Sequence, residues 1–143
     1  MVFRFELVRT IRADRGKVLS YFTRVEDLPR LHPTYVKAVN VISREGNRIL
    51  FEQEVQMKGR RLRSKNQMMV FPDQGRIEVQ TLEGDGRGSK VTMMCMEVSG
   101  GTLLRLLGEL RLGPLEFLFK GVARSLAEKT LDEDVRNIEA IKG

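Results

Sequence analysis

Few side chains in this sequence could perform acid–base or nucleophilic chemistry, because it contains one histidine, His32, and one cysteine, Cys95. A single histidine cannot supply the imidazole pair typical of a metal site, and no neighbouring motif would activate Cys95 as a nucleophile. The chain also lacks a phosphate-binding loop, a dinucleotide fingerprint and a nucleophile elbow. We therefore expect no metal and no cofactor.

His32 and Glu97 are the two candidates for general acid–base catalysis. His32 ends an expected short helix. A general base must lie within hydrogen-bond reach of its reacting group, and nothing in the sequence shows such a group. A histidine that caps the helix end is therefore the favoured alternative. Glu97 would share a strand face with Val91, Met93 and Cys95. A carboxylate on such a face could have a raised pKa. A bulge or strand end that lets Glu97 reach water is favoured, and the equally apolar opposite face leaves the strand register open.

The elements that must position these residues follow from the hydrophobic pattern. Alternating apolar and polar residues predict strands at 1–11, 35–44, 48–57, 60–71, 76–82 and 89–98. Short turns join the later strands, which favours an antiparallel meander. Two short helices are expected after the first strand. Asp14 would cap the first, Thr23 and Glu26 have capping-box spacing for the second, and His32-Pro33 ends it.

The last thirty residues predict one long amphipathic helix. Gly113-Pro114 is a helix-start signal, and an apolar stripe of near-helical period continues to Ile138. A helix over 114–141 would be about 42 Å long. The leucine-rich stretch 100–112 before it has three alternatives: a mobile lid over a cavity, an edge strand, or a contact with a second subunit. The flanking glycines favour the lid.

One face of the expected strands combines apolar residues with uncharged polar ones. If Phe51 points inward, alternation brings Gln53 with it, and Ser64 and Asn66 accompany Leu62 and Met68 in the same way. Ile77 and Val79 on the next strand bring Thr81. A few polar groups on an apolar face fit a ligand pocket, where they orient a largely apolar guest. The alternative is that these groups bond to one another or to buried water.

The opposite strand faces are charged, and a basic run surrounds the turn near residue 59, with Lys58, Arg60, Arg61, Arg63 and Lys65. This run could dock anionic lipid headgroups or nucleic acid. It contains no interleaved aromatic residue for base stacking, and the facing strand offers Glu52 and Glu54. We therefore favour a solvated, partly neutralised sheet face over a nucleic-acid site.

Composition sets the protein class. The chain has 143 residues, 41% of them hydrophobic and 31% charged, with a formal net charge of +6. These values are typical of one folded domain, here 1–143, with a substantial core. The isolated cysteine and the absence of a signal-peptide pattern or a long apolar run favour a cytoplasmic location over secretion or membrane insertion.

The order of these elements resembles the START-like (SRPBCC) superfamily, which includes pollen-allergen proteins, lipid-transport domains and polyketide cyclases. The matching residues are Ile11, Ala13, Val18, Leu19, Phe22, the segment 28–33, Val36, Val39 and the segment 88–92. Leu31 departs from the pattern, since many members carry tryptophan there. The resemblance implies a helix-grip α+β fold: a curved antiparallel sheet of six or seven strands around the long C-terminal helix, with an apolar cavity between them.

We therefore expect a non-catalytic carrier or sensor that binds a hydrophobic small molecule or lipid in a cavity of roughly 300 Å³ or more. The expected lining residues are Phe51, Gln53, Leu62, Ser64, Asn66, Met68, Ile77, Val79, Leu115, Phe119 and Val122. The first alternative is a cyclase- or dehydratase-like enzyme that uses His32 or Glu97, and the second is an interaction module with a filled core. Expected partners exclude nucleic acid and include transient contact with a membrane surface, with the chain a monomer or homodimer.

Overall fold

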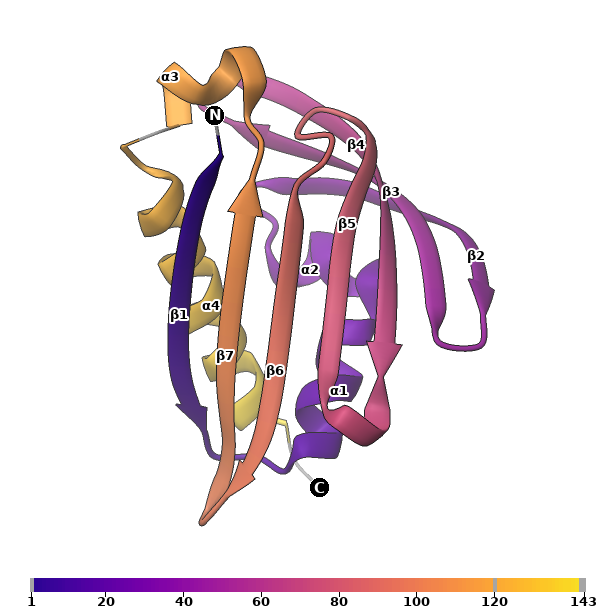
Figure 1. Cartoon of the computed structure of the whole chain (residues 1–143), viewed down its shortest axis with the longest axis vertical. Helices are drawn as coiled ribbons and strands as arrows, with labels where there is room; N and C mark the ends of the chain where they lie inside the picture. Colours follow the sequence, from indigo (N-terminus) through magenta and orange to yellow (C-terminus); the bar gives the residue numbers. More distant parts are fainter. Residues whose placement is uncertain (1, 120, 142–143) are drawn as a thin grey trace.

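The computed structural model describes residues 2–119 and 121–141, without the side chains of Leu115, Phe117 and Leu118. Seven strands and several short helical segments precede one longer C-terminal helix (Figure 1). In chain order the elements are β1 (Phe3–Ile11), α1 (Arg15–Thr23), η1 (Val25–Asp27), α2 (Leu28–Leu31), β2 (Val36–Glu45), β3 (Arg48–Met57), β4 (Arg60–Phe71), η2 (Pro72–Gln74), β5 (Arg76–Gly84), β6 (Lys90–Val98), β7 (Gly101–Leu110), η3 (Gly113–Leu115), α3 (Glu116–Phe119) and α4 (Ala123–Glu139).

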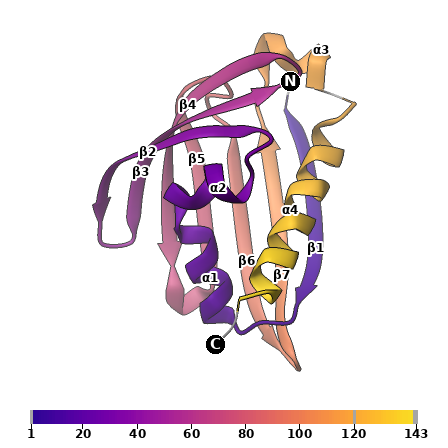
Figure 2. The same cartoon turned by 180° about the vertical axis from the view of Figure 1, so that it is seen from behind.

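The seven strands form one antiparallel sheet in the order β1-β7-β6-β5-β4-β3-β2. Strands β2 to β7 are sequential neighbours, which confirms the predicted meander, and β7 returns beside β1. Helices α1, α2 and α4 all lie on the same face of the sheet (Figure 2). The predicted α+β helix-grip architecture, with two short helical segments after the first strand, is therefore confirmed.

Bulges bend the sheet on the β2–β4 side. The β2–β3 register shifts twice, and the β4–β5 register shifts between Lys65 and Asn66. Gly84 lies beside the β4–β5 bulge with φ +88°, and a Cβ there would be 2.3 Å from the carbonyl oxygen of Arg63. Glycine is therefore required at the place where β5 approaches β4 most closely. Such bulges increase local twist and curve the sheet toward the helices.

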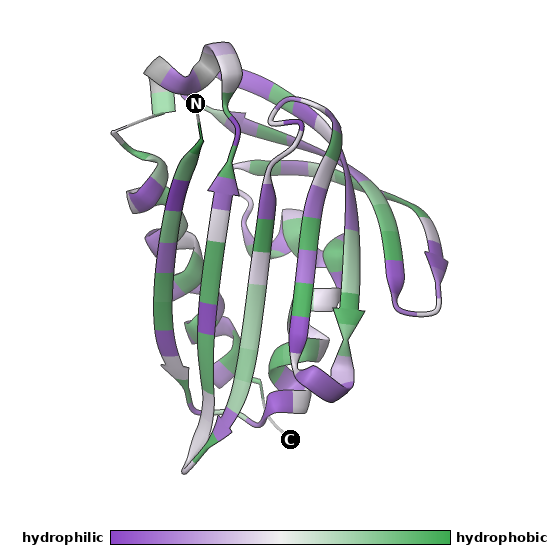
Figure 3. Ribbon diagram, in the orientation of Figure 1, coloured by the Kyte–Doolittle hydropathy of each residue, from purple (hydrophilic) through white to green (hydrophobic). Residues whose placement is uncertain are grey.

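Strand alternation separates the apolar face from the charged face, as the banding along the strands indicates (Figure 3). The predicted bounds of β3 and β4 agree with the structure, and those of β2, β5 and β6 differ by one or two residues. The two faces differ clearly in β4, where Met68 is 4% exposed and the side chain of Arg63 is 75% exposed. The apolar face supplies the core beneath α1 and α4.

The prediction of a mobile lid at 100–112 was wrong. Residues 101–110 form β7, which is hydrogen-bonded to β1 on one side and β6 on the other. Its apolar residues follow a period of two: Thr102 and Leu104 are fully buried, and Arg105 is exposed. The hydroxyl of Thr102 also donates to the carbonyl of Ala13 at 2.7 Å, which fixes the corner between β1 and α1.

The prediction of one continuous helix over 114–141 was also wrong. Gly113-Pro114 does open a helical turn, η3, and α3 follows it, but α4 begins only at Ala123 and contains 17 residues. Its length is therefore about 26 Å rather than 42 Å. Gly121 lies before α4, and glycine is a poor helix former because it loses the most backbone entropy. The apolar stripe within α4 packs on the core as predicted.

Two of the predicted helix caps are confirmed, and the predicted capping box is wrong. Asp14 caps α1, where its carboxylate accepts a hydrogen bond from the backbone N–H of Lys17 at 2.9 Å. The capping box at Thr23 and Glu26 does not form. The Thr23 hydroxyl donates to the carbonyl of Ser20, and Glu26 pairs with Arg44 of β2. His32 is the C-cap of α2, as predicted, and its backbone N–H bonds the carbonyl of Leu28.

We predict that Gly101→Ala destabilises the fold by about 1–3 kcal/mol, the usual cost of forcing atoms into a packed site. A Cβ at position 101 would be 2.1 Å from the carbonyl oxygen of Ile11, which is backbone and cannot rotate away. Gly121→Ala is the matched control, since nothing lies within 4 Å of its added Cβ. Urea unfolding of both variants measures the difference. Equal free energies of unfolding for the two variants would contradict this steric explanation.

Candidate functional site

The predicted binding residues of β3, β4 and β5 lie on the face of the sheet that the helices cover. Direct strand pairs join Phe51 to Asn66, Gln53 to Ser64 and Met68 to Val79, which places these side chains on one face. The buried members of the predicted set are Phe51, Asn66, Met68, Ile77 and Phe119. The half-buried members are Gln53, Leu62, Ser64, Val79 and Val122. The side chain of Leu115 lies outside the described part of the chain.

The polar groups on this inner face form a short hydrogen-bonded ladder. Thr81 Oγ1 donates to Asn66 Oδ1 at 2.8 Å, and Asn66 Nδ2 donates to Ser64 Oγ at 3.0 Å. Asn66 is only 2% exposed, so the ladder satisfies an otherwise costly buried amide. Gln53 has no side-chain hydrogen bond to any described residue and is half-buried.

Solvent exposure changes along the inner face. Ile49, Phe51 and Met68 are 3–4% exposed and belong to the core. Farther along the same strands, Val55 and Leu62 are only partly buried and lie outside that core cluster. This end of β3 and β4 lies at the same end of the molecule as α3 in both views (Figures 1 and 2). The inner face is therefore fully buried toward α1 and only partly buried at Val55 and Leu62.

The outer face carries the basic hairpin. A shallow hollow of about 420 Å³ over β2 to β5 is lined mainly by the charged residues of this face, and Gln53 and Ser64 of the predicted binding set also line it. Glu54 binds Arg63 at 2.8 Å and lies 3.8 Å from Arg61, and Glu83 lies 3.4 Å from Lys65. These contacts agree with the favoured interpretation of a solvated and partly neutralised face. Ion pairs as exposed as these contribute little to stability.

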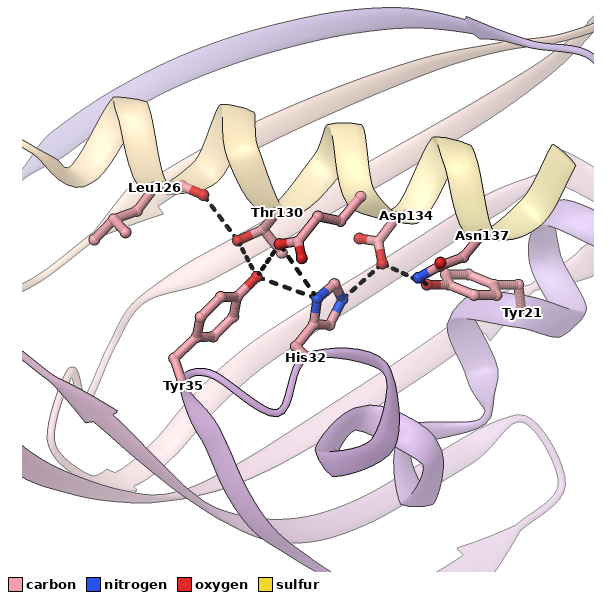
Figure 4. A network of polar contacts seen from close by, with 8 residues as sticks. Tyr21, His32, Tyr35, Leu126, Thr130, Asp134 and Asn137 are labelled. Carbon is pink, nitrogen blue, oxygen red and sulfur yellow. Dashed lines mark hydrogen bonds and ion pairs between the residues drawn. The ribbon is translucent and has the colours of Figure 1, made fainter. Parts of the chain in front are cut away.

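A buried polar network centred on His32 joins α1, α2, β2 and α4 (Figure 4). His32 Nε2 lies 2.7 Å from Asp134 Oδ1, and Tyr21 Oη donates to the same oxygen at 2.6 Å. Asn137 Nδ2 donates to Tyr21 Oη at 3.1 Å. On the other side of the imidazole, the Tyr35 ring stacks on His32, with centroids 5.4 Å apart.

Tyr35 extends the network to the preceding turn of α4. Its Oη lies 3.1 Å from His32 Nδ1, 2.6 Å from Thr130 Oγ1 and 3.1 Å from Glu133 Oε1. Thr130 Oγ1 also lies 2.8 Å from the carbonyl oxygen of Leu126, an arrangement in which Tyr35 donates to Thr130 or Glu133. With Tyr35 as that donor, Nδ1 of His32 donates to Tyr35 and Nε2 donates to Asp134, which is the pattern of a protonated imidazolium.

The surrounding charges also favour the protonated state of His32. Burial alone lowers the pKa of His32, but the hydrogen bond to Asp134 and the charges of Asp134 and Glu133 outweigh it and raise the pKa above 6.5. Burial raises the pKa of Tyr35 to about 12, so that phenol stays protonated. His32 is 2% exposed and both of its ring nitrogens are engaged. Its evident role is to attach α4 to the α2–β2 connection.

Glu97 lies at the end of β6 farthest from α3, where it reaches solvent. Its side chain is 74% exposed and its carboxylate lies 3.8 Å from Arg15 Nε. Met93 and Cys95 are buried and Met96 is 61% exposed, which settles the strand register. By alternation Glu97 shares a strand face with the buried Met93 and Cys95. It lies at the end of the strand, however, and its side chain reaches solvent, which is the alternative that the sequence favoured. His32 and Glu97 therefore lie in different surroundings and share no contact.

Sequence reasoning missed every partner of His32. Thr130, Glu133, Asp134 and Asn137 recur at three- and four-residue spacing along α4, beside the apolar stripe. A polar row of that period next to a buried stripe is a signal for a helix that packs against another polar group. The only histidine of the chain was the obvious candidate for that group.

We predict that the stability contributed by His32 is lost as pH rises. Because its pKa is raised in the folded state, the contribution is complete below the unfolded value of about 6.5 and disappears as pH increases through the higher folded pKa. Urea unfolding of the wild type and His32→Gln from pH 6 to 9 should give a difference in free energy that shrinks with pH. Thr102→Val, which removes a buried hydrogen bond to the carbonyl of Ala13 outside the network, should show a constant difference. A His32→Gln difference that grows with pH would contradict the charged assignment.

Comparison with solved structures finds the same fold at low sequence identity. TTHA0849 from Thermus thermophilus is 19% identical with a TM-score of 0.80, and the match covers 96% of this chain and 94% of that one. The Zhui aromatase/cyclase from Streptomyces sp. R1128 is 12% identical with a TM-score of 0.78, covering 97% and 92%. A START superfamily protein from Mycobacterium smegmatis is 15% identical with a TM-score of 0.75, covering 94% and 98%.

A search of curated proteins found no significant match. Among the described residues, no helix is long and apolar enough to cross a membrane. The family described as polyketide cyclase / dehydrase and lipid transport matches residues 2–141, nearly the whole chain. Together with the START-like fold, this match confirms the resemblance drawn from the sequence. The chain belongs to the polyketide cyclase / dehydrase and lipid transport family.

Proposed function

We propose that this domain binds a hydrophobic small molecule or lipid between the inner face of the sheet and the α3–α4 segment, without transforming it. The observation that carries the proposal is the partial exposure of inward-facing apolar residues at the α3 end, Val55 and Leu62 among them. Inward apolar side chains are normally covered, and leaving them accessible to water costs free energy that a bound apolar guest would recover. The family description supports a ligand of this class.

The polar groups of the inner face suit an orienting role. The ladder Thr81–Asn66–Ser64 ends at a half-buried serine hydroxyl, and the unbonded amide of Gln53 lies on the paired position of the next strand. A guest with one polar group would find both a donor and an acceptor there, beside apolar surface from Leu62 and Val55. This is the composition expected of a small-molecule site.

The alternative, a cyclase- or dehydratase-like activity, rests on the family description and on the fold shared with an aromatase/cyclase. Such an enzyme needs an acid or base at the guest. The imidazole of His32 faces α4 with both nitrogens engaged, and Glu97 lies at the opposite end of β6 from α3. These placements favour a carrier or sensor.

Mass spectrometry of the gently extracted protein under native conditions tests the proposal directly. We expect a co-purifying apolar species that organic solvent removes and that rebinds at a ratio of one. Chemical conversion of this species by the intact protein, abolished by His32→Ala or Glu97→Ala, would favour the enzyme instead. A protein that carries nothing and binds no apolar probe would favour an interaction module with a filled core.

Substitution of Leu62 locates the site. We predict that Leu62→Glu weakens binding of the co-purifying species by at least about tenfold, because a charge must then be desolvated beside an apolar guest. Met96→Glu is the matched control, since Met96 is 61% exposed on the other side of β6. Fluorescence competition with an apolar dye measures both affinities. Equal losses for the two variants would contradict a site on the inner face.

A further inference from the structure

A second hollow, of about 450 Å³, lies between α1, α2 and the C-terminal end of α4. It is therefore at the end of α4 remote from α3, away from the partly buried end of the inner face. Its volume is within the range of small-molecule sites. The lining residues are Lys17, Ser20, Tyr21, Arg24, Asp27, Arg30, Leu31, Asn137, Ala140 and Ile141.

The charges around this hollow are unbalanced. Three cations line it, Lys17, Arg24 and Arg30, against one carboxylate, Asp27. That carboxylate is already 3.5 Å from the guanidinium of Arg30. Lys17 and Arg24 form no ion pair with any described residue. Two cations that share one concave surface without a counter-charge favour an anionic group between them.

Helix electrostatics do not explain this arrangement. Lys17 belongs to the first turn of α1, where the helix dipole favours anions and disfavours a cation. Its charge therefore has no favourable partner within its own helix. Arg24, the C-cap residue of the same helix, is the second cation among the lining residues.

The remaining lining is apolar or capable of neutral hydrogen bonds. Leu31, Ala140 and Ile141 contribute apolar surface, and Ile141 is 45% exposed, one of the most exposed large apolar residues described. Tyr21 and Asn137 close the deep side, where Tyr21 Oη is already bonded to Asp134 and Asn137. The amide oxygen of Asn137 forms no hydrogen bond with a described residue.

We propose that this hollow is a second binding site, for a small amphipathic anion: a phosphate or carboxylate group held by Lys17 and Arg24, with a short apolar tail against Leu31 and Ile141. Guanidinium and ammonium groups are the usual partners of both anions, and charge-assisted hydrogen bonds to them are the strong ones. The tail would cover apolar surface that is otherwise exposed. The site is independent of the ligand proposed for the inner face.

Titration of the uniformly ¹⁵N-labelled full chain with n-octyl phosphate, inorganic phosphate and n-octanol tests this proposal by NMR. We expect saturable shifts in the amides of residues 17–24 and 137–141 with n-octyl phosphate. Inorganic phosphate and n-octanol should each bind there at least about tenfold more weakly, because each lacks one half of the ligand. Equal affinity for inorganic phosphate would overturn the proposed tail contact and leave a free-anion site.

The double variant Lys17→Gln/Arg24→Gln should weaken n-octyl phosphate at these amides by about tenfold or more. Lys129→Gln/Arg87→Gln removes the same charge from exposed residues that do not line the hollow, and should change the affinity less than about twofold. Similar losses in both double variants would indicate attraction to net charge alone and overturn the site.

The location of the shifts separates this site from the inner face. Shifts confined to β3, β4 and α3 would place the alkyl chain against the inner face and overturn the second site, whatever the affinity. Ile141→Ser provides an independent check, since it should weaken n-octyl phosphate but leave inorganic phosphate unchanged. Identical effects of Ile141→Ser on both probes would overturn the assignment of the tail.

Discussion

The hydrogen bond between His32 and Asp134 determines where α4 lies on the sheet, and the rest of the architecture depends on that position. Removing two charges from water is costly, and the cost is offset only when the remaining hydrogen-bonding capacity is satisfied. Tyr21, Tyr35 and the surrounding side chains satisfy it here. Because such a network tolerates one geometry, it specifies the rotation and the axial position of α4 more than it stabilises the fold.

The hydrogen bond between His32 and Asp134 holds the C-terminal half of α4, and the apolar side chains of that half pack on the core. Leu131 and Ile138 are 3% and 1% exposed and pack on the core with Val18 and Leu104. The chain before Ala123 is constructed differently, from the short segments η3 and α3 rather than a continuous helix. One helix of about 26 Å cannot cover the whole apolar face of a curved sheet of seven strands. The coverage is therefore tight at one end and incomplete at the other.

Much of this fold could be predicted from the sequence because strand alternation and turn residues are local signals. The bounds of β3 and β4 followed from alternation alone. The errors came where a local pattern supports two structures. The leucines of 101–110 suit a lid as well as a strand, and only their pairing with β1 and β6 decides between them. The stripe after Gly113 continues through Gly121 in sequence, although the helix does not.

The candidate site was less predictable, because its members meet only through long-range contacts. Alternation placed Phe51, Gln53 and Asn66 on one face, but it could not show that Asn66 is satisfied by its neighbours and that Gln53 is not. His32 and Asp134 are 102 residues apart, and nothing local relates them.

The network also lies between the hollow at the C-terminal end of α4 and the chain that precedes this helix. Tyr21 and Asn137 belong both to the network and to the lining of the hollow between α1 and α2, and Val122 and Phe119 lie at the other end. An anion near Lys17 would act on Tyr21 and Asn137, next to the charged pair. The buried contacts of α4 and the hollow between α1 and α2 therefore share two side chains.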